Sequence, residues 1–497
     1  MELILIGGCF ALVVFLYFSH NPMKHGTWFM IRRFINWFPL GMTYSFLYFG
    51  RYNLNVSKNA LGSLMTKEDF GIIFAVGTTV YALSFLINGP LVDKIGGKKG
   101  IIIAAAGACV ANILMGVATY VFLSGYYSIN LVITLSLLYG LNMYFQSYGA
   151  VSIIKVKAYW FHVRERGIFG AIFGTLISFG VYFAFDWGQS IVDSTKVAVT
   201  GELTYVQRIL RTLVGADTAT IDPTWYVFFI PGICLIFWII MDLICIKDTP
   251  SQANFQDFDT HDASSGEMDK EFSFSDLLKR IFTSPIMLIL AAVEFCSGVI
   301  RNGIMQWYFI FAKEVPQIGA EFFFQHWGLL TCFTGIIGSF AAGFISDKLF
   351  QSRRGPPVAI FGFLMFLAIT TMAFVLYSSP LVVGLCATLV LTVVIGVHSL
   401  MSGTAAADFG GRKATGTASG IVDGFVYLGS GLQSLSLGYI TSWNWQFWPI
   451  FLAPFALLGT LFAIKIWKAL PTATKKYLQD VEKIDSNFHK LQKDLKS

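Results

Sequence analysis

Two arginines lie inside apolar stretches of this chain, where a fixed positive charge is energetically costly. Arg51 ends an aromatic run in FGRYNLN, and Arg301 lies in SGVIRNGIMQW. An arginine at membrane depth costs about 2.5–3.5 kcal/mol on insertion scales, so such a residue usually serves a function. Arg301 is the clearer case, because it lies 16 residues after Pro285 and 12 before Lys313. Arg51 has a second interpretation, in which it reaches a nearby membrane surface, since Lys58 follows seven residues later.

The two guanidinium groups suit one class of ligand. A guanidinium stays protonated in proteins, and its fork of donors pairs bidentately with phosphate or carboxylate. If Arg51 and Arg301 converge on one cavity, they form a binding site for a dianion.

A proton-coupled site would also need a titratable side chain in the cavity. Glu294 lies seven residues before Arg301, two helical turns back on roughly the same face. We name Glu294 and His398 as candidate coupling residues. Each has an ordinary alternative: Glu294 pairs with a cation, or His398 is a hydrogen-bonded structural residue. Three further carboxylates lie in or near apolar segments, namely Asp186, Asp242 and Asp423.

Composition places these residues in a membrane protein. Of the 497 residues, 55% are hydrophobic and 13% are charged, and the mean hydropathy is +0.64. A soluble protein has about 25% charged residues. Apolar runs of about 20 residues recur along the chain, as in membrane-spanning helices, whereas the two-residue alternation of a membrane barrel is rare. The sequence therefore predicts an all-α polytopic membrane protein embedded in the lipid bilayer.

Several other features argue against other classes of protein. The net charge of +6 is attributed to cytoplasmic loops rather than to nucleic-acid binding. The seven cysteines are scattered through apolar runs without a C-x-x-C motif, so we expect small core residues. No nucleophile–base pair, metal-ligand cluster or G-x-x-x-x-G-K-[ST] motif stands out, so we expect neither an enzyme nor a cofactor.

Thirteen apolar segments follow one another along the chain. They lie near residues 2–19, 34–57, 70–92, 100–123, 129–153, 167–190, 224–246, 285–312, 326–347, 357–378, 380–402, 414–439 and 446–468. The first has no basic region and no A-x-A-like site, which favours a retained extra transmembrane anchor, residues 1–22, over a cleaved signal peptide. Lys24, Arg32 and Arg33 follow it and should stay cytoplasmic, which puts the N-terminus outside.

Basic loops fall on one side of the other twelve segments, which predicts that this side is cytoplasmic. They are 93–100, 155–167, 347–355 and 410–413, together with a Lys-rich tail. A polar cytoplasmic linker, residues 247–284, separates a six-helix bundle in 30–246 from another in 285–470. The tail, residues 471–497, is predicted to form a cytoplasmic amphipathic helix. We expect the protein in the cell (inner) membrane.

The two groups of six segments repeat one motif. GPLVDKIGGKK (89–99) ends the second segment of the first group, and GFISDKLFQSRRG (343–355) ends the second segment of the other. Both have a glycine, an Asp-Lys pair four residues later and then two basic residues. Each group also has its arginine in its first segment. Two such halves, related by an axis along the membrane normal, are typical of a parallel-repeat transporter.

This repeated loop resembles the signature loop of the major facilitator superfamily. The resemblance implies two six-helix bundles around a central cavity. It also implies that the loop locks helices together on the cytoplasmic side and gates the conformational change. That role would fall to Gly89, Asp93, Lys94, Lys98 and Lys99, with Asp347 in the second half.

Longer stretches resemble the organophosphate:phosphate antiporter family. They include YFGRYNLNVSKNAL (48–61), WFHVRERG (160–167), VIRNGIMQWYFIFAKEV (299–315) and GRKATGTASGIVDGFVYLGSG (411–431). The resemblance implies that Arg51 and Arg301 clamp a phosphate group. Polar neighbours are predicted to line the cavity, namely Tyr44, Tyr48, Asn55, Gln146, Asn302 and Trp307.

The expected function is the exchange of a sugar phosphate or glycerol phosphate for inorganic phosphate by alternating access, performed by a monomer. The sequence departs from the family at two positions, where Phe85 replaces a lysine and Ile177 replaces a histidine. Both changes remove a cation from the predicted site. Two alternatives therefore stay open: a membrane sensor of sugar phosphate, and a carrier of an organic carboxylate such as a hexuronate.

Overall fold

The computed structural model describes residues 2–19, 21–162, 165–199, 202–258, 260, 279, 282–315, 320–350, 353–401 and 415–469. Within these residues every regular element is a helix, which confirms the predicted all-α fold class. The predicted tail helix, residues 471–497, and most of the linker between 261 and 281 lie outside the described residues.

Each of the thirteen apolar segments overlaps a long helix in the part of the chain that the structure describes. These helices are α1 (Glu2–Ser19), α2 (Thr27–Leu61), α3 (Lys67–Ile95), α4 (Gly97–Ser124), α5 (Leu131–Trp160), α6 (Arg166–Tyr182) continuing through the π-helical turn η3 (Phe183–Trp187) into α7 (Gly188–Thr195), α9 (Tyr226–Cys245), α11 (Pro285–Met305) continuing into α12 (Trp307–Glu314), α14 (Trp327–Phe344) continuing into η6 (Ile345–Leu349), α15 (Gly355–Val375), α16 (Pro380–His398), α18 (Thr415–Trp443) and α19 (Phe447–Lys465). Short helices lie between them: η1 (Gly62–Leu64), α8 (Tyr205–Leu213), η4 (Ala216–Thr218), η5 (Ser251–Ala253) and α13 (Glu321–Gln325). Eight of the described helices are long and apolar enough to cross a membrane.

Local sequence determines where several helices begin and end. Thr66 caps the start of α3 in a capping box with Asp69. Pro285 occupies the first turn of α11, directly after the capping side chain of Ser284. Gly96 ends α3 with a φ of 89°, a backbone conformation that favours glycine.

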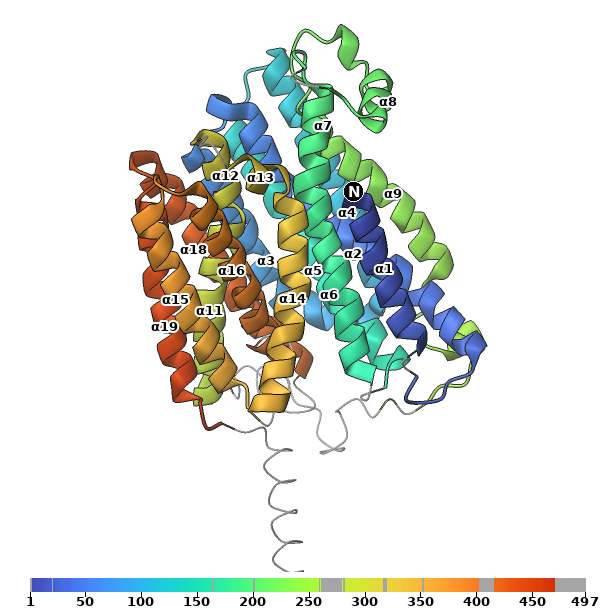
Figure 1. Ribbon diagram of the computed structural model, residues 1–497. Helices are drawn as coiled ribbons and strands as arrows, with labels where there is room; N and C mark the ends of the chain where they lie inside the picture. Colours follow the sequence, from blue (N-terminus) through green and yellow to red (C-terminus); the bar gives the residue numbers. More distant parts are fainter. Residues whose placement is uncertain are drawn as a thin grey trace, which may run out of the picture.

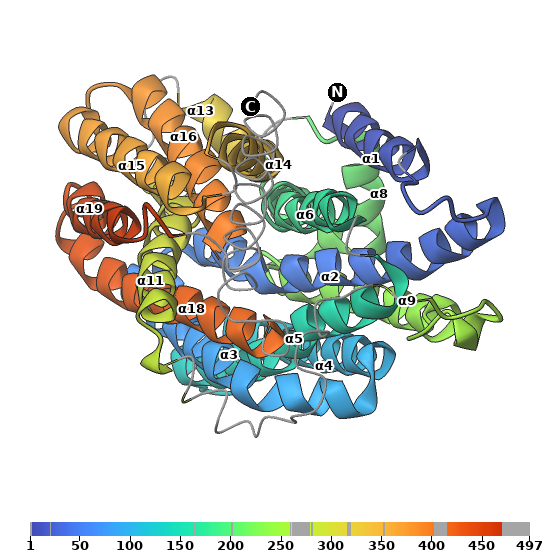
Figure 2. The same ribbon diagram turned by 90° about the horizontal axis from the view of Figure 1, so that it is seen from below.

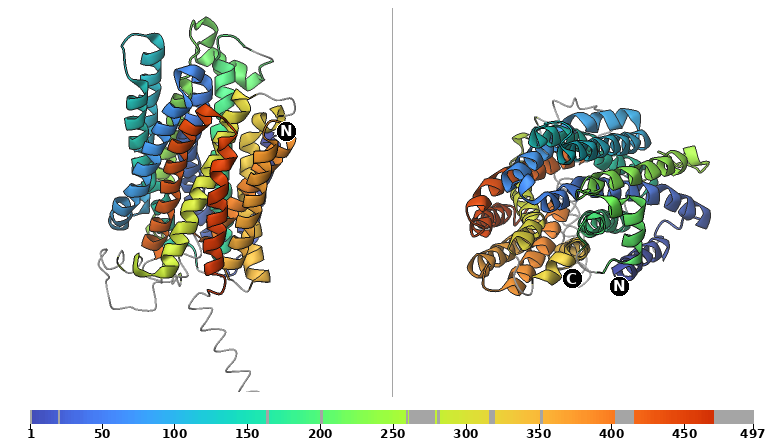
Figure 3. Two further views of the ribbon diagram at one scale, coloured as in Figure 1. Left: turned by 90° about the vertical axis from the view of Figure 1, so that its left-hand side faces the viewer. Right: turned by 90° about the horizontal axis from the view of Figure 1, so that it is seen from above.

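The long helices α2 to α9 form what we call the first half of the molecule, and α11 to α19 form the second half (Figure 1). The main packed pairs of described helices that join the halves are α3 with α18 and α6 with α14. The side view in Figure 3 shows that the long helices of both halves run roughly along one common direction. The residue limits of the two bundles stay a prediction.

We call the helix ends next to the predicted cytoplasmic loops the inner side, and the opposite ends the outer side. The short helix α8 lies at the outer side, at the top of Figure 1. The helix pair α3–α18 is close on the outer side, where a Cβ added at Gly71 would lie 2.6 Å from the carbonyl oxygen of Ser434. On the inner side, a Cβ at Gly89 or Gly420 would meet nothing within 4 Å. Among the described residues, the halves therefore touch on the outer side and leave open space at these two inner positions.

Helix α1 packs against α6 at the edge of the first half (Figure 2). The hydroxyl of Tyr17 donates to the carbonyl of Met30 at 2.7 Å and accepts from Nε of Arg33 at 3.0 Å. Arg33 also donates to both carboxylate oxygens of Glu165, at 2.9 and 2.8 Å. Burial raises the pKa of Glu165, but the hydrogen bonds and charge of Arg33 outweigh it and hold that pKa below its ordinary value. The N-terminal helix is thereby tied to the connection between α5 and α6.

Candidate functional site

Arg51 lies on α2 and is fully buried. Its Nε donates to Oε1 of Gln146 at 2.9 Å, and its Nη1 donates to the hydroxyl of Tyr427, on α18 of the second half, at 2.9 Å. The guanidinium carbon lies 4.6 Å from the ring centre of Tyr48 and 4.5 Å from that of Tyr81. Its Nη2 has no hydrogen-bond partner among the described residues. Arg51 is therefore held in place with one donor group left over.

A buried polar network in the first half positions Arg51. Nε2 of Gln146 donates to Oδ1 of Asn142 at 3.0 Å, and Asn142 donates to the carbonyl of Gly50 at 2.9 Å. Asn112 donates to the same carbonyl at 3.2 Å. Buried amides of this kind are stable only when their partners are present, so the network fixes the orientation of Gln146. Gln146 was predicted from the sequence to line the cavity, but the two asparagines behind it were not.

Arg301 reaches the same region from α11. Its side chain is partly exposed, its guanidinium carbon lies 5.9 Å from the ring centre of Tyr427, and its Nε has no hydrogen-bond partner among the described residues. Tyr427 therefore contacts both arginines: its hydroxyl accepts from Arg51, and its ring lies near both guanidinium groups. The sequence analysis quoted the stretch that contains Tyr427 without identifying it as a site residue.

Further polar contacts cross between the halves beside the arginines. The hydroxyl of Tyr52 donates to Oδ1 of Asn302 at 3.4 Å, and Asn302 donates in turn to the hydroxyl of Ser430. Asn55, one helical turn after Arg51, is fully buried, and neither of its side-chain polar atoms has a described partner. The side-chain amides of Gln306 and Gln433 also have no hydrogen-bond partner among the described residues. Buried polar groups are nearly always hydrogen-bonded, so these amides are candidates for contact with a polar ligand.

Two of the three aromatic residues among the predicted lining residues, Tyr44 and Trp307, lie at opposite ends of this region. The ring of Tyr44 lies 5.3 Å from that of Tyr48, in an edge-to-face arrangement. Trp307 is fully buried on the outer side, where its ring lies 5.8 Å from Phe70 of α3 and 6.1 Å from Trp445. The structure thus places Trp307 in an aromatic layer between the arginines and the outer side.

Ion pairs close the outer side of the interface between the halves. Glu314 of α12 lies 3.3 Å from Nζ of Lys58 and 3.0 Å from Nζ of Lys67, both from the first half. Lys67 also lies 4.5 Å from the ring centre of Trp445. Nδ2 of Asn59 donates to the carbonyl of Phe309 at 3.1 Å. These contacts join α2 and α3 to the second half.

Asp186 makes a second outer connection, between α6 and α14. It lies in the π-helical turn η3, and its carboxylate accepts hydrogen bonds from the backbone of Gly328 at 2.7 Å and of Leu329 at 2.8 Å. These are unsatisfied donors at the start of α14, so the carboxylate acts as a cap from the other half. A Cβ at position 328 would lie 2.6 Å from the Asp186 carboxylate, so this close approach requires a glycine.

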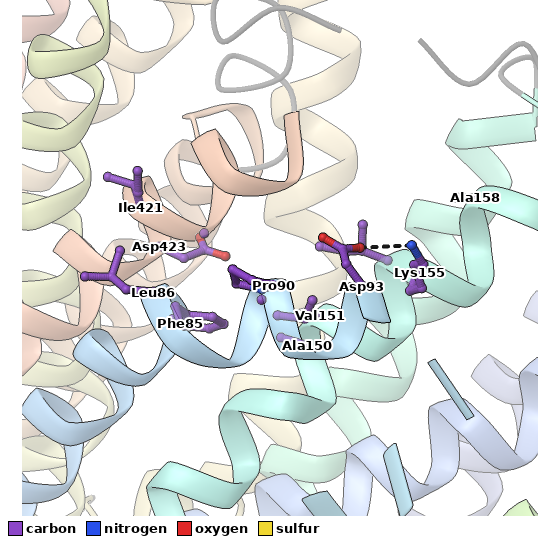
Figure 4. Close-up of a pocket in the computed structure, with 13 residues that line it drawn as sticks. Phe85, Leu86, Pro90, Asp93, Ala150, Val151, Lys155, Ala158, Ile421 and Asp423 are labelled. Carbon is purple, nitrogen blue, oxygen red and sulfur yellow. Dashed lines mark hydrogen bonds and ion pairs between the residues drawn. The ribbon is translucent and has the colours of Figure 1, made fainter. Parts of the chain in front are cut away.

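The inner side instead holds a cavity of about 220 Å³ between the halves (Figure 4). Its walls come from α3, α5 and α18: Phe85, Leu86, Gly89, Pro90, Asp93, Ala150, Val151, Ile154, Lys155, Ala158, Gly420, Ile421 and Asp423. Phe85 lies at the deep end, with its ring 4.8 Å from Tyr81, which in turn contacts Arg51. The cavity therefore leads from the inner side towards the arginine site.

The predicted gating residues of the first half contact only their own half in the described structure. Asp93 pairs with Lys155 of α5 at 3.0 Å. The backbone of Lys98 donates to Asp248 at 2.7 Å, and its Nζ donates to the carbonyl of Leu243 at 2.6 Å. Gly89 lines the cavity, and the other two lysines of the loop, Lys94 and Lys99, are exposed. The side chain of Asp347 lies outside what the structure describes, and the gating role stays a prediction.

The two candidate coupling residues are partners of each other. Glu294 is fully buried, and its carboxylate oxygens lie 3.1 and 3.3 Å from Nδ1 of His398. Ile177, which was expected to replace a histidine, is partly buried and packs against apolar core residues. The second half therefore contains an acid–imidazole pair, whereas α6 of the first half has the apolar residue Ile177.

Comparisons with known proteins agree with the fold. The chain matches the family model of the Major Facilitator Superfamily over residues 34–434. A probable hexose phosphate transport protein of Chlamydia pneumoniae is 23% identical and covers 87% of this chain and 90% of its own length. The membrane sensor protein UhpC of Salmonella typhimurium and the glycerol-3-phosphate transporter of Bacillus subtilis are each 24% identical, covering 81% of this chain and 84% of their own.

Solved structures support the same fold. A bacterial homologue of the human lysosomal transporter Spinster, in an inward-facing and occupied conformation, superposes with a TM-score of 0.62 at 13% identity, over 87% of this chain and 96% of that one. A D-xylose–proton symporter gives a TM-score of 0.60 at 14% identity, over 87% and 97%. The family and these relatives confirm that the chain is a multi-pass membrane protein and not an enzyme. The chain belongs to the major facilitator superfamily, and its relatives match the organophosphate:phosphate antiporter family within it.

Proposed function

We propose that this protein exchanges an organophosphate for inorganic phosphate across the cell (inner) membrane by alternating access. The observation that carries the proposal is that Arg51 and Arg301, one from each half, both contact a single residue, Tyr427. Each arginine keeps a nitrogen without a described partner. Two such guanidiniums suit a phosphate dianion, which can accept several hydrogen bonds from each.

The proposed binding step replaces Tyr427 by the ligand. A phosphate oxygen takes the donor that Arg51 now gives to the Tyr427 hydroxyl, and the remaining oxygens accept from Arg301. Gln146 keeps Arg51 in position during this exchange, because it binds Nε rather than the terminal nitrogens. Since the phosphate then bonds to both halves, its binding favours their approach on the inner side.

The same geometry explains why exchange is expected rather than one-way flux. When the inner cavity closes without a ligand, two buried guanidiniums approach each other with no anion between them. Their repulsion in a medium of low polarity opposes closure. A phosphate compound on either side removes this penalty, so one compound enters as another leaves.

The organic part of the ligand is proposed to be a sugar or glycerol moiety. Aromatic residues gather around Arg51 and at the deep end of the inner cavity: Tyr44, Tyr48, Tyr81 and Phe85. Aromatic rings pack against the C–H faces of a carbohydrate while tyrosine hydroxyls hydrogen-bond to it. The relatives named as hexose phosphate and glycerol-3-phosphate transporters support this choice.

Exchange in proteoliposomes tests the proposal. Vesicles loaded with inorganic phosphate should take up labelled phosphate, and glucose 6-phosphate or glycerol 3-phosphate should inhibit the uptake. Arg51→Ala and Arg301→Ala should abolish exchange, and Arg301→Lys should reduce it strongly because it loses the bidentate geometry. Arg208→Ala is the matched control, since this arginine lies on the outer helix α8 and donates to the carbonyl of Leu203. An Arg301→Lys variant that transports at the wild-type rate would refute the clamp.

Two other functions remain as outcomes of this experiment. The relative named as a membrane sensor favours the first, in which sugar phosphate binds saturably but no flux occurs. The apolar residues Phe85 and Ile177 favour the second, in which a hexuronate, and not phosphate, drives exchange.

We also propose that the protein acts as a monomer with its N-terminus outside and its C-terminus in the cytoplasm. The charge pattern of the loops supports this topology. Protease accessibility of tags at the two ends, in intact cells and in inverted vesicles, tests it. Equal accessibility of both tags from outside would contradict it.

A further inference from the structure

Glu294 and His398 form an acid–imidazole pair in the wall of the second half, below the arginine site. The carboxylate is fully buried, whereas the imidazole is 26% exposed. Helix α11 is continuous from Pro285 to Met305, so the seven residues between Glu294 and Arg301 correspond to about 10 Å along its axis and a rotation of only about 20°. The pair therefore lies on the same face of α11 as the arginine, two turns closer to the inner side.

The charged groups around Glu294 come from three helices. His398 approaches from α16, Asp423 from α18, and Arg301 from α11 itself. The fourth helix packed against α11 is α19, whose buried residues carry no charge. Asp423 also lines the inner cavity. The pair is therefore within electrostatic range of both the arginine site and the inner cavity.

We propose that the Glu294–His398 pair binds a proton when a phosphate dianion occupies the arginine site and releases it when the dianion leaves. This inference rests on the proposed function and assigns a proton-coupling site to it. Nδ1 of His398 faces the carboxylate, so Nε2 is the nitrogen that takes the proton from water on the inner side. The product is an imidazolium paired with a carboxylate, and the proton returns to water when the ligand dissociates.

The sign of the coupling follows from electrostatics. A negative charge placed about 10 Å away favours the protonated pair by on the order of tenfold for each unit of charge, at the effective dielectric constant near protein cavities. Coupling between two binding events is reciprocal. A fall in pH must therefore tighten binding of the dianion by the same factor.

Calorimetry on the purified protein tests this coupling. The heat of binding of glucose 6-phosphate and of glycerol 3-phosphate is measured at pH 7.5 in two buffers with different ionisation enthalpies. A phosphate ester has its second pKa near 6 and is a dianion at this pH, so any proton taken up is bound by the protein. We expect the wild type to take up a measurable fraction of one proton per ligand bound.

Variants assign the proton to the pair. His398→Gln and Glu294→Gln should bind the ester without proton uptake, and the affinity of each should no longer rise as the pH falls. His326→Gln is the matched control, because His326 directly precedes α14 on the outer side. It should take up the same fraction of a proton as the wild type.

The possible failures are distinguishable. Wild-type protein that binds the esters with equal heat in both buffers would overturn the coupling and leave a purely structural ion pair. This outcome is measured on the wild type alone, so it does not depend on whether a variant folds. Proton uptake that persists in both pair variants would place the site elsewhere and also overturn the proposal. Absence of both ester binding and phosphate exchange would instead remove the proposed function, and the coupling with it.

Discussion

In the part of the chain that the structure describes, α3 and α18 meet differently on the outer and inner sides of the interface between the halves. On the outer side, Gly71 lets α3 approach the backbone of α18, and Glu314 joins lysines of the other half. On the inner side, the same two helices line a cavity, and Gly89 meets no neighbour. The contact between Arg51 and Tyr427 lies between these two regions.

This difference is the one on which the proposed alternating access depends. Packing and ion pairs close one side, while the opposite ends of the same rigid helices remain apart. A rocking motion about the level of the arginines would exchange the two arrangements without unfolding any helix. A variant that weakens or prevents closure of one side should therefore shift the population towards exposure of that side.

Two engineered cysteines report this population in a background without the seven native cysteines. Gln433→Cys replaces a buried residue on the outer part of α18, and Ile154→Cys lies in the inner cavity. Labelling of the first by a polar thiol reagent requires an open outer side, and labelling of the second requires an open inner side. The ratio of these two labelling rates measures the effect of the variants of Gly71, Gly89, Glu314 and Asp186.

The largest effect is expected from Gly71→Leu. Its Cβ would lie 2.6 Å from a backbone oxygen of α18, so α3 and α18 cannot close on the outer side. Overpacking costs about 1–3 kcal/mol, which favours outer exposure by about 5- to 150-fold. Gly89→Leu is the matched variant, because it fits the present arrangement but obstructs closure of the inner side. It should change the labelling ratio in the opposite direction. A change in the same direction for Gly71→Leu and Gly89→Leu would contradict the rocking motion.

Glu314→Gln should have the next largest effect. It removes the charge that holds Lys58 and Lys67, and Lys58 is only 4% exposed. The expected cost is about 1–2 kcal/mol, between the values for exposed and buried ion pairs, or about 5- to 30-fold towards outer exposure. High salt should weaken the wild-type bridge and so reduce the difference between wild type and variant. An unchanged labelling ratio at low salt would show that Glu314 does not hold the outer side closed.

A smaller effect is expected from Asp186→Asn. The amide still offers one acceptor to the start of α14 but loses the charge that interacts with the helix dipole. This loss is worth about 0.3–1 kcal/mol, so the ratio should move at most about fivefold towards outer exposure. Asp193→Asn is the control, because Asp193 pairs with Lys196 close by in the sequence. A control that moves the ratio as much as Asp186→Asn would indicate a general charge effect.

The smallest effect on the labelling ratio is expected at Glu165, because its partner Arg33 belongs to the same half. This pair should instead affect stability in acid. Since the folded pKa of Glu165 is lowered, its contribution is present above the ordinary carboxyl pKa of about 4.3 and is lost as the pH falls through the folded value. Between pH 7 and pH 4, the melting temperature should fall further for the wild type than for Glu165→Gln. Glu202→Gln, at an exposed position, should behave like the wild type.

Much of the fold could be predicted from the sequence because membrane-spanning helices leave a strong signal. Long apolar runs and basic loops fix the order of the helices and the all-α class. The α6–α7 element was also found as one segment, although it contains a π-helical turn where Asp186 leaves the helical register. The sequence pattern does not show that this turn aims a carboxylate at another helix.

The site was only partly predictable, because its contacts join residues that are far apart in sequence. Arg51 and Arg301 were identified by their charge in apolar surroundings, but Tyr427 is an ordinary residue for an apolar helix. The pairing of Glu294 with His398 likewise depends on how α11 and α16 pack, which spacing along one helix does not give. From the sequence, Arg301 was the clearer candidate for a buried arginine, and Arg51 could have reached a membrane surface. In the structure Arg51 is fully buried, because α2 is enclosed by other helices of its half, and Arg301 is partly exposed.

The shared contact of Arg51 and Arg301 with Tyr427 also has an electrical consequence. With a phosphate dianion between them, the two guanidiniums are neutralised, and the loaded site carries no net charge through the membrane. An unloaded site would carry two positive charges, each of which responds to a membrane voltage with about 2.3 kcal/mol per 100 mV. Exchange through this site should therefore be indifferent to voltage, whereas any return of the unloaded carrier should depend steeply on it.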